Sequence, residues 1–140
     1  MTTRHLTAAV LGCVVAGLTG CSTPEPALGG TTATVTIDGN DAGGVHAVRC
    51  RQTGTSWYIE TPEKDRGFTA VLASEESMTA KSVEFRDLGG FTGNFWADNI
   101  GEAQVTGSNG KYTITGVADG NFADKPLDAA TAKFRIQTSC

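Results

Sequence analysis

The sequence has little charge and no excess of basic residues. Asp, Glu, Lys and Arg make up 19% of the 140 residues, and 11 Lys and Arg against 15 Asp and Glu give a net charge of -4. A nucleic-acid-binding surface needs a basic excess, so this class is excluded. The ordinary hydrophobic fraction of 39% excludes a disordered acidic chain. The 18 glycines, about twice the average usage, exclude a long helical protein.

The sequence also lacks the motifs of common catalytic sites. It has no Gly-x-Ser-x-Gly elbow, no His-Glu-x-x-His motif and no Gly-x-x-x-x-Gly-Lys-Ser/Thr phosphate loop. His46 is the one histidine beyond the N-terminal segment, and its phase with Val48 predicts a partly buried structural residue. Adjacent acids such as Glu75-Glu76 lie near turns, where carboxylates are solvated. We therefore expect a protein that is not an enzyme.

Two acidic turns resemble calcium-binding loops but lack essential ligands. The turn that starts at Asp38 has Arg49 at position twelve, where a bidentate glutamate is needed. The turn that starts at Asp119 lacks the glycine at position six and has Ala130 at position twelve. No Cys-x-x-Cys spacing predicts a zinc site. We therefore expect no metal and no cofactor.

No long hydrophobic run predicts a permanent transmembrane helix in the N-terminal segment. The apolar run 6–18 holds about 13 residues, fewer than the roughly 20 that span a bilayer. Because the basic Arg4 precedes it, the run is typical of a cleaved export signal. We expect residues 1–20 to be a signal peptide and the mature protein to be exported.

The end of this signal predicts its type. Leu18, Thr19, Gly20 and Cys21 match the bacterial lipobox, in which the cysteine thiol receives a diacylglyceryl group. The alternative is a conventional signal, cut after Ala16 or Gly20, that leaves Cys21 as an ordinary thiol. One acyl chain holds a protein only marginally, so the diacylglycerol and palmitate chains of a lipoprotein would anchor it stably. We expect the protein on the outer face of the cytoplasmic membrane, in the cell wall or at the surface.

A stretch rich in proline, glycine and hydroxyl residues follows the lipobox. The letters STPEPALGGTTA offer almost nothing to bury, which predicts a flexible tether over 21–33. Thr31, Thr32 and Thr34 would be accessible there to O-glycosylation, and a plain unmodified tether is the alternative. The single folded domain is then expected over 34–140.

The four cysteines reduce to one pair. Cys13 leaves with the signal and Cys21 carries the lipid, so Cys50 and Cys140 remain in the mature domain. Two cysteines in an exported domain predict one disulfide. Both are in phase with inward-facing residues of their segments, so the periodicity predicts the same pair.

The folded part consists of short segments in which apolar and polar residues alternate. These segments recur at spacings of roughly 8 to 12 residues with turn signals between them, of which Asn109-Gly110 is the strongest. The pattern predicts an all-β, mainly antiparallel domain of about 8 strands, either a small β-sandwich or a half-open barrel. The sequence allows at most one short helix, near 125–132, where Pro126 suits a helix start.

Five aromatic residues are candidates for a ligand site or a surface patch. Neighbouring residues of a strand point to opposite faces, so both members of an adjacent aromatic pair cannot enter one core. One of each pair faces outward or a second layer, where it marks a binding surface unless a helix or loop covers it. The five are Trp57, Tyr58, Phe95, Trp96 and Phe122.

Several segments together resemble one family. They are L-T-G-C at 18–21, V-T-I-D-G-N-D at 35–41, K-Y-T-I-T-G-V-A-D-G at 111–120 and K-F-R-I-Q-T-S-C at 133–140. With the tether and the cysteine at position 50, they look like the mycobacterial 19 kDa lipoprotein antigen family, LpqH-like, with an LppE-like branch as the suggested subgroup. The resemblance implies a cell-envelope lipoprotein with a Cys50–Cys140 disulfide and no known catalysis. It also implies recognition of the acylated terminus by host innate receptors.

Two functions of different class remain open. The first is a non-enzymatic, lipid-anchored envelope lipoprotein whose β domain displays a binding surface or has a structural role. The second is a carrier of a lipid or small apolar ligand, held between the sheet and residues 122–132. A cavity of at least about 300 Å³ lined by the aromatic residues would favour the carrier, and a filled core would exclude it. A cluster of His46 with two carboxylates in a cleft would instead indicate an enzyme.

Overall fold

The computed structural model describes residues 31–140. The predicted signal peptide, the lipobox and Cys21 lie outside the described residues, as does most of the predicted tether. Within the described part, no helix has the length and apolar character needed to cross a membrane.

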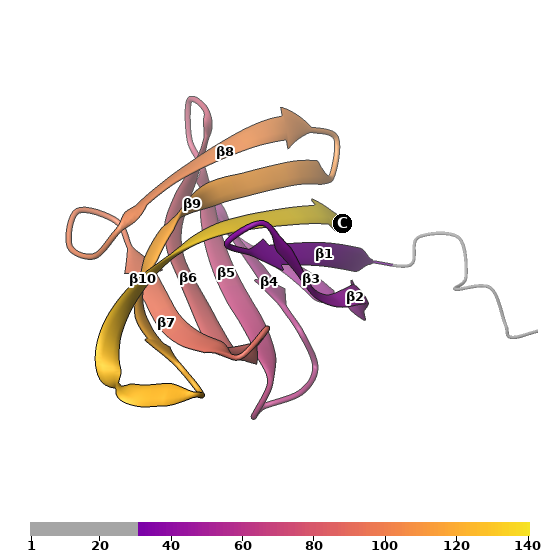
Figure 1. Ribbon diagram of the computed structural model, residues 1–140. Coiled ribbons are helices and arrows are strands. Elements are labelled where there is room, and N and C mark those ends of the chain that lie inside the picture. Colours follow the sequence, from indigo (N-terminus) through magenta and orange to yellow (C-terminus); the bar gives the residue numbers. More distant parts are fainter. Residues whose placement is uncertain (1–30) are drawn as a thin grey trace, which may run out of the picture.

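The described residues form ten strands of one antiparallel sheet that curls into a nearly closed barrel (Figure 1). The order across the sheet is β2-β1-β10-β9-β7-β6-β5-β4-β3, and β8 pairs with β9. The all-β antiparallel prediction is confirmed, with a barrel rather than two separate sheets and with more strands than the sequence indicated. The strands are β1 (Thr32–Ile37), β2 (Asn40–Ala47), β3 (Arg49–Thr53), β4 (Ser56–Glu60), β5 (Gly67–Ser74), β6 (Met78–Leu88), β7 (Phe91–Trp96), β8 (Glu102–Ser108), β9 (Lys111–Phe122) and β10 (Lys125–Ser139).

The two ends of the sheet, β2 and β3, are consecutive in the chain and are joined at Val48. The Val48 N–H donates a hydrogen bond of 3.1 Å to the Thr31 carbonyl, and the Thr31 hydroxyl donates to the Val48 carbonyl. The chain therefore passes directly from the strand that pairs with β1 to the strand that pairs with β4. This passage brings the two ends of the sheet together and closes most of the barrel.

The short helix that the sequence allowed near 125–132 does not form, because these residues belong to β10. Ala130 and Ala132 pair with Gly120 and Ala118 of β9. The register is irregular between Lys125 and Ala130, so a proline in this stretch interrupts no regular ladder. Pairing with the long strand β9 thus outweighs the local helix-start signal.

The interior of the barrel is filled with side chains. Phe85 is fully buried there, with its ring centroid 6.0 Å from that of Phe91 and 5.1 Å from that of Phe134. The alternating strands supply the remaining core residues, as their sequence pattern predicts. The largest fully buried side chains are Phe68, Phe85, Phe91, Ile59, Leu72, Leu88, Ile114, Ile136, Val35 and Val83.

Strand β9 changes partner along one edge, and glycine makes this change possible. Its residues 111–117 pair with β8, whereas residues 119–122 pair with β7. At Gly120 a β-carbon would lie 2.0 Å from the Thr92 carbonyl oxygen and 2.5 Å from the Gly93 α-carbon. The close approach of β7 and β9 at this point therefore requires glycine.

We expect Gly120→Ala to lower the free energy of unfolding by about 1–3 kcal/mol, because the added methyl group must push β7 away from β9. Urea denaturation followed by circular dichroism measures the change. Lys111→Ala, at an exposed position of the same strand, is the control and should change the free energy by less than about 0.5 kcal/mol. Equal stability of the Gly120→Ala protein and the wild type would contradict this packing argument.

Candidate functional site

The five aromatic candidates do not surround a common space. Phe95 is 4% exposed and belongs to the core, whereas the adjacent Trp96 is 60% exposed on β7. Trp57 packs against the core, while Tyr58 is half-buried on the opposite face of β4. Phe122 is half-buried at the end of β9, with its ring centroid 5.2 Å from that of Phe91. Each adjacent pair therefore divides between the two faces of the sheet.

The outward members of the two pairs lie on one continuous line across the barrel wall. Tyr58 of β4 is directly opposite Val71 of β5, and Ser82 of β6 is directly opposite Trp96 of β7. Directly opposite residues of neighbouring strands share a face, so these registers join the two aromatic residues. We call this line the outer row, and it consists of Arg51, Tyr58, Val71, Ser82 and Trp96, one residue from each of β3 to β7.

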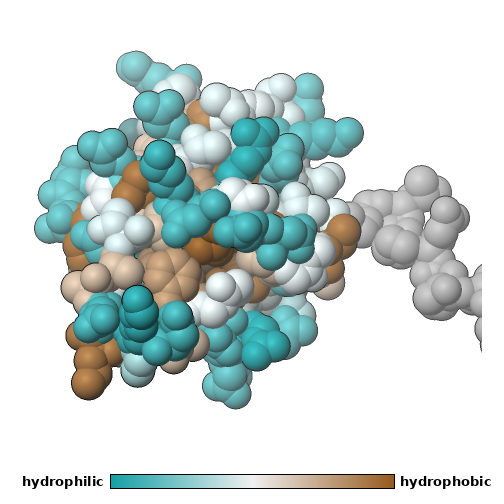
Figure 2. All heavy atoms as spheres, in the orientation of Figure 1, coloured by the Kyte–Doolittle hydropathy of each residue, from teal (hydrophilic) through white to brown (hydrophobic). Residues whose placement is uncertain are grey.

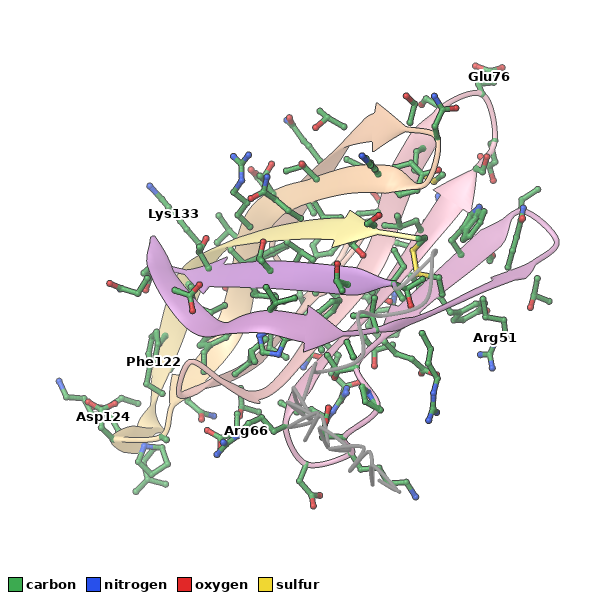
Figure 3. The ribbon with its side chains drawn as sticks, turned by 90° about the vertical axis from the view of Figure 1, so that its right-hand side faces the viewer. Arg51, Arg66, Glu76, Phe122, Asp124 and Lys133 are labelled. Atoms are coloured by element: carbon green, nitrogen blue, oxygen red, sulfur yellow. A yellow bond between two sulfur atoms is a disulfide. The ribbon has the colours of Figure 1, made fainter. Side chains whose placement is uncertain are left out.

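Both ends of the outer row are fixed by local contacts. At one end the Arg51 guanidinium carbon lies 5.1 Å from the centroid of the Tyr58 ring, within the range of a cation–π interaction. Figure 3 shows the Arg51 side chain on the outside of the barrel. At the other end Trp96 and Ile100 exchange two backbone hydrogen bonds of 2.8 and 2.9 Å. Ile100 is 37% exposed and continues the apolar surface beyond Trp96.

Polar residues lie on both sides of the outer row. One neighbouring line passes through Arg49, Glu60, Thr69, Glu84 and Asn94, again by direct pairing from strand to strand. The other passes through Thr53, Ser56, Ala73 and Thr79. The outer row is thus a narrow apolar and aromatic band between hydroxyl, amide and charged groups.

Arg86 organises the polar side that contains the carboxylates. Its Nη1 donates a hydrogen bond of 2.9 Å to the Thr69 hydroxyl and lies 3.6 Å from Glu84 Oε1. Its Nη2 donates to the Glu63 carbonyl at 3.5 Å. Arg86 therefore links polar groups of β5, β6 and the loop between β4 and β5, and it balances the charge of Glu84.

His46 lines a surface hollow of about 440 Å³ together with two carboxylates, the arrangement that would indicate an enzyme. Each group is already engaged within its own turn or ion pair. His46 Nε2 forms a hydrogen bond of 2.8 Å with the Ala42 carbonyl oxygen. Asp41 accepts hydrogen bonds from two glycine N–H groups, and Asp87 pairs with Arg66 at 3.1 Å. The hydrogen bonds of the described residues do not link His46 to either carboxylate, so this hollow holds no assembled base and acid.

The acidic turns have structural partners. Asp38 Oδ1 accepts a hydrogen bond of 2.8 Å from the Lys133 N–H, which fastens the β1–β2 turn to β10. Asp119 accepts a bond of 3.1 Å from the Thr131 hydroxyl. Over residues 31–140, no group of three or more His, Cys, Asp or Glu side chains is placed to hold a metal ion.

The disulfide joins Cys50 of β3 to Cys140 after the end of β10, with the two α-carbons 5.8 Å apart. Figure 3 shows it as the yellow bond beside the end of β10. Strand β1 begins next to it at Thr32, two residues before the predicted start of the domain. Of the three threonines predicted as glycosylation sites, Thr32 and Thr34 are therefore half-buried residues of β1, and Thr31 is hydrogen bonded to Val48.

Several hollows open on the surface of the barrel. A hollow of about 440 Å³ lies under the β9–β10 hairpin, where Phe122 is the one aromatic residue that lines it. At the tip of this hairpin Leu127 is 97% exposed, and Figure 2 shows apolar atoms at the lower left, where the hairpin projects. This hollow is lined by residues of the hairpin itself and by one of the five aromatic candidates, rather than by the aromatic set that was expected to line a carrier cavity.

Sequence reasoning missed most members of the outer row. Arg51, Val71 and Ser82 carry no motif, and each reads as an ordinary strand residue; the same holds for Ile100 beside the row. Their common feature is their position opposite one another, which depends on the register between strands. The sequence did indicate that one residue of each adjacent aromatic pair faces outward, and this was the available signal for the row.

Comparison with known proteins identifies the family. Residues 26–140 match the family model described as Mycobacterium 19 kDa lipoprotein antigen. A Mycobacterium avium subsp. hominissuis protein described as "Putative lipoprotein" is 40% identical over 98% of this chain and 96% of its own length. "Probable lipoprotein LppE" of Mycobacterium tuberculosis is 30% identical over 91% of this chain and 90% of its own. "Lipoprotein LpqH" of Mycobacterium avium is 30% identical over 76% of this chain and 66% of its own. The chain therefore belongs to the Mycobacterium 19 kDa lipoprotein antigen family and is a lipoprotein of the cell envelope.

Proposed function

We propose that this chain is a non-enzymatic lipoprotein, held at the outer face of the cytoplasmic membrane by lipid on Cys21, whose β domain presents the outer row as a binding surface. The observation that carries this proposal is the outer row itself, which crosses five strands of a barrel with a filled core and carries the half-buried Tyr58 and the exposed Trp96. Such a barrel offers its wall, rather than its interior, to a partner.

The position of the first strand supports attachment by one end of the barrel. Strand β1 starts at Thr32, beside the Cys50–Cys140 disulfide, and pairs there with Ser139. Ten residues separate Thr32 from Cys21, so an extended chain could reach about 35 Å from the lipid. The acidic net charge of -4 favours a domain that stands away from an anionic membrane surface.

The same arrangement separates two roles. The acylated Cys21 would be the feature that host innate receptors recognise, whereas the barrel would act through its wall. A carrier of an apolar ligand is less well supported, because Phe85 and its neighbours occupy the space between the strands. The engaged His46 and Asp87 give no support to catalysis.

We expect Cys21→Ala to abolish incorporation of an acyl-chain label and to move the protein from the membrane fraction to the soluble or secreted fraction. The reason is that the tether offers no other strong attachment. Cys13→Ala is the matched control, because it removes a cysteine from the signal and leaves the lipobox intact. A reporter of innate receptor activation should respond to the control and not to Cys21→Ala. Labelled, membrane-bound Cys21→Ala protein would contradict the proposed anchor.

A further inference from the structure

We propose that the outer row binds an uncharged polysaccharide chain laid across strands β4 to β7. This inference names the partner of the binding surface proposed above and so rests on that proposal. It depends on three features of the outer row: an exposed aromatic face, a length that suits several sugar rings, and polar side chains of balanced charge on both sides.

The exposed aromatic face is Trp96. Its side chain is 60% exposed although its neighbour Phe95 is buried, so the indole is available to a partner. Sugar rings present C–H groups on one face, and an aromatic ring covers that face while hydroxyl groups remain free at the edge. The paired backbone hydrogen bonds between Trp96 and Ile100 hold the indole-bearing turn in place before binding. A prepared surface of this kind loses little conformational entropy on association.

The length of the outer row suits a chain rather than a single sugar. Tyr58 and Trp96 lie three strand spacings apart, which corresponds to about 14 Å. Between them Val71 and Ser82 supply a small apolar contact and a hydroxyl group. An oligosaccharide of several rings could therefore contact both aromatic residues at once.

The polar flanks match the edges of sugar rings. Glu60, Glu84 and Asn94 offer acceptors to hydroxyl groups on one side, and Ser56 and Thr79 offer hydroxyl groups on the other. These charges are largely balanced within the protein. Glu84 lies 3.6 Å from Arg86, and Glu60 is directly opposite Arg49.

The mixture of charges beside the outer row favours an uncharged sugar polymer over a charged or an apolar partner. The row and its flanks carry both signs, because Arg49, Arg51 and Arg86 lie among Glu60 and Glu84, so a polymer with many charges of one sign meets like charges as well as opposite ones. An extended apolar partner would remove water from the same carboxylates without replacing their hydrogen bonds, which is costly. A partner with many hydroxyl groups and no charge avoids both penalties.

A second copy of the chain or another protein fits the outer row less well. A stable protein interface buries about 800 Å² on each partner and has an apolar centre. The apolar part of the outer row is one residue wide, with charged side chains on the next line. Its narrow shape favours a chain-like partner over a broad protein surface.

Binding can be followed through the fluorescence of Trp96 itself. In a mature chain that carries Cys21→Ala and Trp57→Phe, Trp96 is the only tryptophan. The probes are a soluble mannan and a soluble α-glucan, with the anionic polygalacturonate as a third polymer. We expect at least one neutral polymer to shift the Trp96 emission and to protect it at least twofold from acrylamide quenching. Polygalacturonate should have no effect.

Affinity electrophoresis of variants then locates the site. With Trp57 restored, we expect Trp96→Ala and Tyr58→Ala each to weaken retardation in the neutral polymer at least tenfold. Val45→Ala removes an equally exposed apolar residue from β2 and should bind as the parent does. The inference falls if neither neutral polymer binds, if Trp96→Ala binds normally, or if polygalacturonate binds equally well.

A further experiment distinguishes failure of the sugar partner from failure of the proposed binding surface. The protein is expressed in its native host with a photo-crosslinking amino acid at position 71, and its adducts are identified. Adducts with carbohydrate support the inference. Adducts with a protein or a second copy overturn the sugar partner but retain the binding surface. If the parent protein binds no polymer and the probe at position 71 forms no adduct, both the inference and the proposed surface are wrong.

Discussion

Replacing both Cys50 and Cys140 with alanine should lower the free energy of unfolding by about 3–5 kcal/mol. The disulfide joins residues that are 90 positions apart in the sequence. In the chain-entropy model, closing a loop of this length in the unfolded chain contributes about 4.6 kcal/mol. A small exported domain has a total stability of only about 5–15 kcal/mol, so the loss would be a large fraction.

Chemical denaturation of the mature chain with and without the two substitutions measures this loss. The slope against denaturant should also rise, because the unfolded chain without the link exposes more surface. Ser139→Ala, next to the disulfide on β10, is the control and should have a small effect. An unchanged unfolding midpoint after removal of both cysteines would show that the link adds nothing to stability.

The disulfide has a consequence for the outer row as well. Cys50 lies on β3 beside Arg51, and β3 pairs with a single neighbour, β4. Without the link to Cys140, the end strand β3 is held by β4 and by the connection through Val48. Hydrogen exchange in β3 should therefore increase more than in β5 or β6, which are paired on both sides.

Phe85→Ala should lower the free energy of unfolding by about 3–5 kcal/mol. Phe85 is fully buried on β6 and contacts rings from two other strands, Phe91 of β7 and Phe134 of β10. Truncation leaves a cavity between strands that are far apart in the sequence, and the stiff barrel can relax only partly into it. The substitution therefore loses both the transfer free energy of the ring and the contacts that surrounded it.

Phe122→Ala is the matched control for this prediction. Phe122 is half-buried and packs against Phe91 at the end of β9, so its truncation should cost clearly less than that of Phe85. Thermal and chemical unfolding of the two variants compare them directly. If both variants lost the same stability, Phe85 would not be the centre of the core. If Phe85→Ala were as stable as the wild type and bound an apolar dye in its interior, the barrel would have the capacity of a carrier.

Local patterns in the sequence were sufficient to predict the fold class and the disulfide. The sequence alternates over residues 133–140, and the structure buries Phe134, Ile136 and Thr138 while Lys133, Arg135 and Gln137 are exposed. This succeeded because the side-chain period of a strand is a property of the backbone and needs no knowledge of the partner strand. The structure of segment 125–132 was harder to predict from the sequence. Its proline favours the start of a helix, whereas pairing with β9 favours a strand, and this pairing supplies hydrogen bonds that a local pattern does not reveal.

The sequence by itself predicts the lipobox and the tether, and it was sufficient for the alternating segments and the pair Cys50 and Cys140, since each is encoded by residues close together or by a count. The tertiary structure alone decided which strands are neighbours and in what register they pair. That decision placed Tyr58 and Trp96 on one line with Arg51 and Val71, and it engaged His46 with the Ala42 carbonyl oxygen. The physical reason is that a shift of one residue in register would turn each side chain to the other face of the sheet. The outer row therefore exists only because the registers of the four pairings that join β3 to β7 agree.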